Sequence, residues 1–259
     1  MPAAQTIDGV ILALTQIVEV CGAENSRLGY FPALYRRVTE RLKLSIAAGW
    51  FEDGPRMERL DVVFANRYLD AWDQWRAGRP VSASWQVAFG LGTRWRPAIV
   101  QHLMSGMNAH INLDLAIAAA VTCPGAQIQS LERDFGRINQ VLAELVDMVQ
   151  EEIAEVSPWM RLIKTFGGRD ADQVLNLGIQ AARGLSWQHA LRLAALQGDG
   201  QEKERVQAML ELDCAVDIMG QLIVRPGPML RTGLLLARVR EERNTAKVMA
   251  VLSRSEVSN

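Results

Sequence analysis

The chain has 259 residues, of which 49% are apolar and 22% charged, with 28 Lys and Arg against 29 Asp and Glu. This composition is that of an ordinary globular protein and excludes a disordered, fibrous or disulfide-stapled chain. The near-neutral balance also argues against a nucleic-acid binder, which needs a basic field. The three cysteines are scattered and no secretory leader opens the chain, so we expect a reducing, cytoplasmic location.

Apolar residues recur at helical spacing along nearly the whole chain, and no series of alternating strands joined by hairpin turns is found. The predicted helices are, in chain order, 7–20, 32 to the loop that starts at 49, 57–75, 81–92, 97–121, 127–156, 157–165, 172–196, 202–224 and 229–252. A short strand is the second choice for 81–92. No apolar run is long enough to span a bilayer. The sequence predicts an all-α, single-domain bundle of about eight to ten helices over 1–259, with a basic helical tail at about 229–254.

The helix at about 97–121 is predicted to be the central, buried helix of the bundle. From Leu115 onward it is apolar on every side, which is typical of a helix surrounded by others. Just before that run stand four polar residues, Asn108, His110, Asn112 and Asp114. A buried polar group without a hydrogen bond costs roughly 1–3 kcal/mol, so each of these side chains needs a partner or a function.

His110 and Asp114 are four residues apart and therefore share a helix face. A carboxylate at this position could orient the imidazole and raise its basicity, as in a general base. The alternative is a structural pair that holds central helices in register, because structural pairs also perturb pKa values. The sequence leaves both interpretations open.

The helix at 57–75 is the predicted partner of the central helix. Arg67 falls on its apolar stripe and must either reach water or meet a carboxylate, for which Asp114 is the obvious candidate. Arg67 would then either bind an anionic group of a substrate or serve as a buried ion-pair strut. Asn66 and Asp70 lie on the adjacent face of the same helix.

These residues together suggest an enzyme that uses His110 as acid/base and Asp114 to orient it. The expected substrate-binding residues are Arg67, Asn66, Asn108, His102, Asp70 and Asp61. The substrate would be a small hydrophobic molecule, polyketide- or lipid-like, in a helical-bundle pocket. The reaction would be proton transfer without metal or cofactor, such as cyclisation, isomerisation, dehydration or hydrolysis. This hypothesis requires that His110 opens onto an enclosed cavity.

The main alternative is a non-catalytic ligand-binding or protein-interaction module in which the same polar residues form a structural network. A metal site formed by His110, Asp114 and either Asp61 or Asp70 is a third hypothesis. Only three histidines exist and no Glu-x-x-His occurs, so no metal-binding motif supports it. The basic tail could touch a membrane surface, although such helices more often cap a bundle. The oligomeric state is not predicted.

Three blocks of the sequence resemble an uncharacterised bacterial helical family, domain-of-unknown-function family 5995. The blocks are RLGYFPALYRRVT at 27–39, RLDVVFANRYL at 59–69 and GMNAHINLDL at 106–115. The resemblance implies a soluble helical protein, some members of which belong to biosynthetic contexts. It supplies no catalytic residues that could be transferred to this chain.

Overall fold

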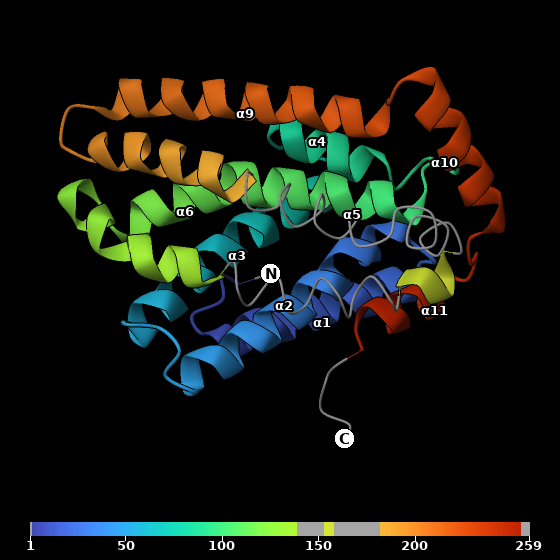
Figure 1. The fold of residues 1–259 in the computed structure, drawn as a ribbon, viewed down its shortest axis with the longest axis horizontal. Helices are drawn as coiled ribbons and strands as arrows, with labels where there is room; N and C mark the ends of the chain where they lie inside the picture. The colour runs from blue at the N-terminus through green and yellow to red at the C-terminus, as the bar shows by residue number, and fades with distance from the viewer. Residues whose placement is uncertain (1, 139–152, 158–181, 255–259) are drawn as a thin grey trace.

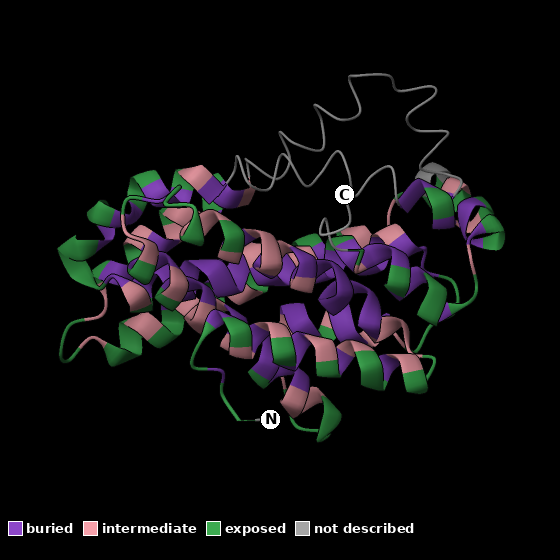
Figure 2. Ribbon diagram, turned by 90° about the horizontal axis from the view of Figure 1, so that it is seen from below, coloured by how far each residue is buried: buried purple, intermediate pink, exposed green. Residues whose placement is uncertain are grey.

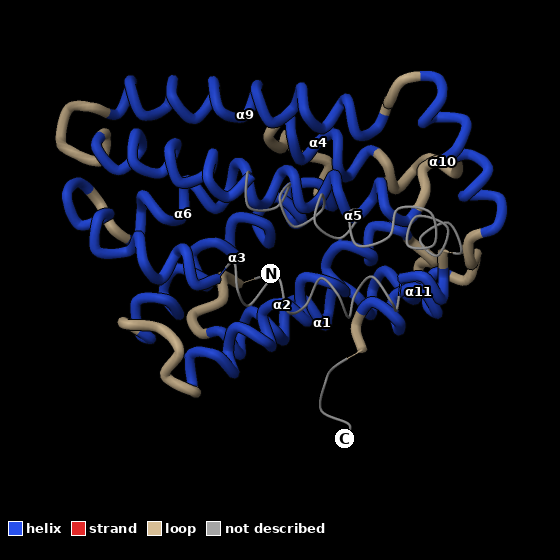
Figure 3. Tube along the Cα trace, viewed as in Figure 1, coloured by secondary structure: helices blue, strands red, loops and turns tan. Residues whose placement is uncertain are grey.

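The computed structural model describes residues 2–138, 153–157 and 182–254, and these ranges contain helices and loops but no strand (Figures 1 and 3). The predicted all-α class is therefore confirmed. The predicted helix at 157–165, the first part of 172–196 and the centre of 127–156 lie outside the described residues.

The first three long helices form the N-terminal part of the bundle: α1 (Ile7–Ala23), α2 (Tyr30–Ala47) and α3 (Gly54–Arg76), with the short 3₁₀ helix η1 (Arg27–Gly29) before α2. Side chains cap two of them, because Thr6 accepts from the Gly9 N–H and Asp53 from the Arg56 N–H. Helices α2 and α3 both pack against α1.

Helix α4 (Ala83–Gly90) settles the ambiguity at 81–92 in favour of the predicted helix. The Ser82 hydroxyl accepts from the Trp85 N–H at its start. The carboxylate of Asp213 accepts from the N–H groups of Ala83 and Ser84 as well. Asp213 is about 130 residues away in the sequence, so this second cap ties α4 to a distant part of the chain.

The predicted central helix consists of α5 (Ile99–Met107), η2 (Asn108–Asp114) and α6 (Leu115–Thr122), and its residues are mostly buried (Figure 2). The predicted helix is confirmed, but its middle segment η2 is a π-helix, which the spacing of apolar residues did not predict. The Leu115 N–H donates to the His110 carbonyl, five residues back instead of four. Such π segments occur often at functional sites.

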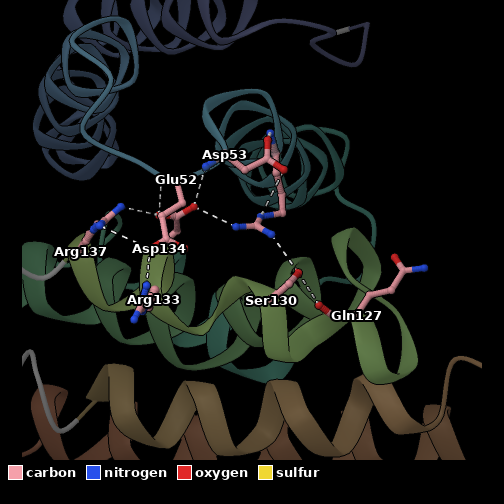
Figure 4. Close-up of polar contacts among 8 residues, drawn as sticks. Glu52, Asp53, Gln127, Ser130, Arg133, Asp134 and Arg137 are labelled. Atoms are coloured by element: carbon pink, nitrogen blue, oxygen red, sulfur yellow. Dashed lines mark hydrogen bonds and ion pairs between the residues drawn. The ribbon is translucent and has the colours of Figure 1, made fainter.

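After the central helix, the chain does not form the predicted α-helix at once: residues Gly125–Leu131 are a 3₁₀ helix, η3, and α-helical geometry begins at 132. Asp134, which follows η3, is fully buried. Its carboxylate accepts hydrogen bonds from the backbone N–H groups of Glu52 and Asp53 and from the side chain of Arg56 (Figure 4). This cluster anchors the α2–α3 loop.

Helix α9 (Glu202–Val224) has the bounds that the sequence predicted, and residues 182–195 form the helix before it. Helix α9 packs against α4, α5 and η2. Its buried residues are Ala208, Leu212, Val216 and Gly220. Its opposite face leaves large apolar side chains in solvent, at Val206, Leu210, Ile218, Met219 and Leu222.

The helical tail predicted at 229–252 is confirmed, with one break along its length. It forms α10 (Pro228–Arg240) and α11 (Thr245–Leu252). The break has a physical cause at Glu241, which is 4% exposed and whose carboxylate accepts from the backbone N–H of Ile99 at the start of α5. Turning this carboxylate inward interrupts the helix, and Asn244 then caps α11.

Candidate functional site

The carboxylate of Asp114 is the centre of a buried polar network. Arg67 of α3 donates from Nε to Oδ1 at 2.9 Å, and Trp85 of α4 donates from Nε1 to Oδ2 at 2.9 Å. His110 Nδ1 lies 3.2 Å from Oδ2. Both oxygens are therefore occupied, and one side chain connects α3, α4 and the central helix. The contact between Arg67 and Asp114 is the one that the sequence suggested.

The imidazole of His110 is enclosed by aromatic rings. Its ring stacks on Phe64 with centroids 3.6 Å apart and an interplanar angle of 10°, and Tyr35 meets it edge-on at 4.4 Å. Phe31 and Trp85 complete the surroundings at 5.7 and 6.2 Å. The side chain is 4% exposed. Aromatic side chains thus fill the space around the residue that the catalytic hypothesis needs beside a cavity.

The charge state of His110 follows from this burial. Burial lowers the pKa of His110, although the hydrogen bond to Asp114 acts in the opposite direction. The imidazole is then neutral, and its proton resides on Nδ1 because Asp114 can only accept. The remaining atom, Nε2, carries a lone pair and has no hydrogen-bond partner among the described residues.

A glycine in the central helix makes this close packing possible. A Cβ atom on Gly106 would lie 2.5 Å from Cγ of Phe31, a distance that real contacts do not reach. The ring of Phe31 therefore rests directly against the helix backbone. Any larger residue at 106 would push Phe31 away from His110.

A small cavity of about 20 Å³ borders Phe31. Its lining includes Phe31, Tyr68, Trp85, His102 and Gly106, but neither His110 nor Asp114. A space of this size holds one water molecule and is far below the several hundred cubic ångströms of a typical ligand pocket. His102 is the predicted site residue that borders it.

The other predicted site residues lie elsewhere. Asn66 binds the backbone N–H and carbonyl of Ala4, so it anchors the N-terminal segment. Asn108 donates to the Val216 carbonyl of α9 and accepts from Asn112. Asp70 is exposed to solvent. The structure therefore brings Arg67, His110 and Asp114 together but not the full predicted set.

Asp61 is buried in α3, and its Oδ2 has no hydrogen-bond partner among the described residues. Burial raises the pKa of Asp61 to about 7, and the charge of Glu58 adds to the effect. Burial of the Tyr35 hydroxyl, together with the nearby charges of Asp61 and Asp114, raises the pKa of Tyr35 well above its usual value. Asp61 is thus partly protonated near neutral pH and protonated below it, close enough to Tyr35 for its charge to affect that residue.

Trp85, Tyr35 and Phe64 were missed as site residues by sequence reasoning. A signal existed for Trp85, because a buried indole N–H needs an acceptor and buried carboxylates are few. Nothing in the spacing of Tyr35 or Phe64 marked them as neighbours of His110. Among the residues described, no group of three or more His, Cys, Asp or Glu is placed to hold a metal ion.

In the part of the chain that the structure covers, no single helix has the length and hydropathy needed to cross a membrane. The pair formed by Ile99–Thr122 and Gly125–Ile138 reaches those values only when taken together, and it is bent by 112°.

Replacing Asp114 with Asn should destabilise the protein by about 3 kcal/mol, the lower end for breaking a buried ion pair, because Arg67 is partly exposed and can turn to water. Denaturant unfolding measures this loss. Asp70→Asn, on the exposed part of α3, is the matched control and should change the free energy of unfolding by less than about 0.5 kcal/mol. Equal effects of the two substitutions would contradict the network.

Asp61 should make the protein less stable as the pH rises. Because its pKa is raised from 3.8 to about 7 on folding, its contribution is complete below pH 3.8 and is lost as the pH passes through 7. The difference in unfolding free energy between the wild type and Asp61→Asn should therefore shift by roughly 3–4 kcal/mol toward the variant between pH 4 and 8. A difference that stays constant with pH would refute the buried, protonated carboxyl.

Comparison with known proteins places the chain in a family. No curated protein and no solved structure matches it. Residues 7–226 match a family of unknown function, DUF5995, and this match covers most of the chain. The three blocks that carry the resemblance in the sequence lie within the matched region. The chain belongs to the DUF5995 family.

Proposed function

We propose that this protein is a non-catalytic interaction module in which the network around Asp114 has a structural role. The observation that carries the proposal is the packing around His110. Phe64 stacks on one face of the imidazole and Tyr35 meets it edge-on, so ordered side chains occupy the space that a substrate would need. In this proposal the imidazole is a polar part of the core.

The bonding of Asp114 supports the same proposal. A buried carboxylate is costly unless its lone pairs are satisfied, and here Arg67, Trp85 and His110 together satisfy them. The three donors come from three separate elements. A network of this kind favours one arrangement of helices over alternatives that would leave the charge unpaired. Its function is then to keep a rigid scaffold on which an exposed surface can act.

A second function, acid/base catalysis on a small hydrophobic molecule, is favoured by one specific observation. The Nε2 atom of His110 has a free lone pair, while Nδ1 is oriented by a carboxylate, as in an activated general base. Catalysis would require Phe64 or Tyr35 to move and open a pocket beside Nε2. The arrangement of the rings makes this the second choice.

Histidine modification by diethylpyrocarbonate separates the two functions, because the reagent attacks an accessible neutral imidazole. In the native protein we expect His189, which is half-buried, to react much faster than His110 or His102, which are buried. Peptide mass spectrometry measures the rate at each site. All three should react in denaturant, which is the control for intrinsic reactivity. Modification of native His110 as fast as His189 would overturn the structural role and favour the enzyme.

A further inference from the structure

Exposed apolar side chains and arginines occur together in two segments, the loop before α5 and the outer face of α10. In the loop, Trp95 is 63% exposed and stands between two exposed arginines, Arg94 and Arg96. On α10, Leu236 and Val239 are 65% and 61% exposed. The exposed arginines of this helix are Arg231 and Arg240. We call these two segments together the basic end surface.

Hydrogen bonds hold the two segments side by side. Arg238 of α10 donates from Nε to the carbonyl of Trp95 at 3.0 Å. Arg27 donates to the carbonyls of Arg94 and Trp95, at 2.9 and 3.0 Å. Because the backbone is fixed from beneath, the loop presents its side chains outward. Figure 1 shows α10 at one end of the long axis of the molecule, where a flat partner could reach it.

The charge of this surface is positive because neither segment contains an acidic residue. The acids that follow α10 in the sequence are already bonded to other groups. The sequence has no Asp or Glu at 74–113 or at 218–240. Glu241, the next acid after α10, is buried and accepts from Ile99 N–H and from Ser157. Glu242 pairs with Lys247. The four exposed arginines of the basic end surface have no carboxylate partner among the described residues.

We propose that the basic end surface binds the surface of an anionic membrane. Trp side chains prefer the headgroup region of a bilayer, and exposed Leu and Val beside Arg are typical of helices that lie in that region. Arginine supplies the attraction to anionic headgroups. A nucleic acid would use the arginines and Trp95 but would leave Leu236 and Val239 without a function. The charge and the aliphatic side chains together therefore indicate lipid.

This inference rests on the proposed interaction function and names its partner. It uses none of the residues that the structure places around His110 and Asp114, so the two proposals can fail separately. Loss of vesicle binding with His110 still protected would remove the partner and keep the structural role. Modification of native His110 with vesicle binding intact would remove the structural role and keep the membrane partner.

The test is co-sedimentation of the full-length protein with vesicles of phosphatidylcholine alone and of phosphatidylcholine mixed with phosphatidylglycerol. We expect binding to the mixed vesicles, weaker binding at high salt, and little binding to the neutral ones. Each arginine replaced, in Arg94→Gln, Arg96→Gln, Arg231→Gln or Arg240→Gln, should weaken binding about fivefold. Leu236→Ser should weaken it at every salt concentration, because its contribution is apolar.

Two controls use exposed residues outside the basic end surface, and one of them, Arg133, pairs with Glu52. Arg133→Gln and Leu12→Ser should leave vesicle binding unchanged, since both side chains are largely in solvent elsewhere in the fold. Thermal unfolding shows that each variant is folded before it is compared. The proposal is overturned if the wild type does not bind anionic vesicles, if neutral vesicles bind it equally, or if the controls lose as much binding as the variants. Binding to single-stranded DNA in place of vesicles would also overturn it.

Discussion

The buried charge of Asp114 is the constraint on which the arrangement of the helices depends. An unpaired carboxylate in a protein core costs several kcal/mol, so this side chain needs donors that it can reach. Arg67 and Trp85 supply two of them from α3 and α4, and His110 supplies the third from the central helix itself. Shifting α3 or α4 along the central helix would remove a donor. One residue therefore links the register of three elements.

The aromatic residues and the π-helix give this network its shape. The π-helical segment η2 contains both His110 and Asp114, and the Leu115 N–H that follows it donates to the His110 carbonyl. Gly106, one turn earlier, lets Phe31 approach the helix backbone, which brings the ring toward His110. Polar and aromatic packing are thus two parts of one arrangement. It leaves a water-sized cavity near His102 and filled space near His110.

Part of this organisation could be predicted from the sequence. Helical periodicity is a local pattern, and a charged residue on an apolar stripe needs a partner of opposite charge. The all-α class, the bounds of α9 and the contact of Arg67 with Asp114 follow from such patterns. The π segment could not be predicted, since an ordinary α-helix satisfies the same apolar spacing. The break in the tail could not be predicted, because Glu241 is drawn inward by the N-terminus of α5, 142 residues away in the sequence. Tertiary contacts of this range leave no trace in a local pattern.

The most direct measurement of the central claim is the titration of His110 by nitrogen NMR, with the signal assigned by comparison with His110→Gln. The account predicts a neutral imidazole at neutral pH, protonated on Nδ1, with a pKa below that of a solvated histidine because burial disfavours the charged form. An imidazole that gains its second proton near neutral pH, as a solvated histidine does, would contradict a structural role in the core.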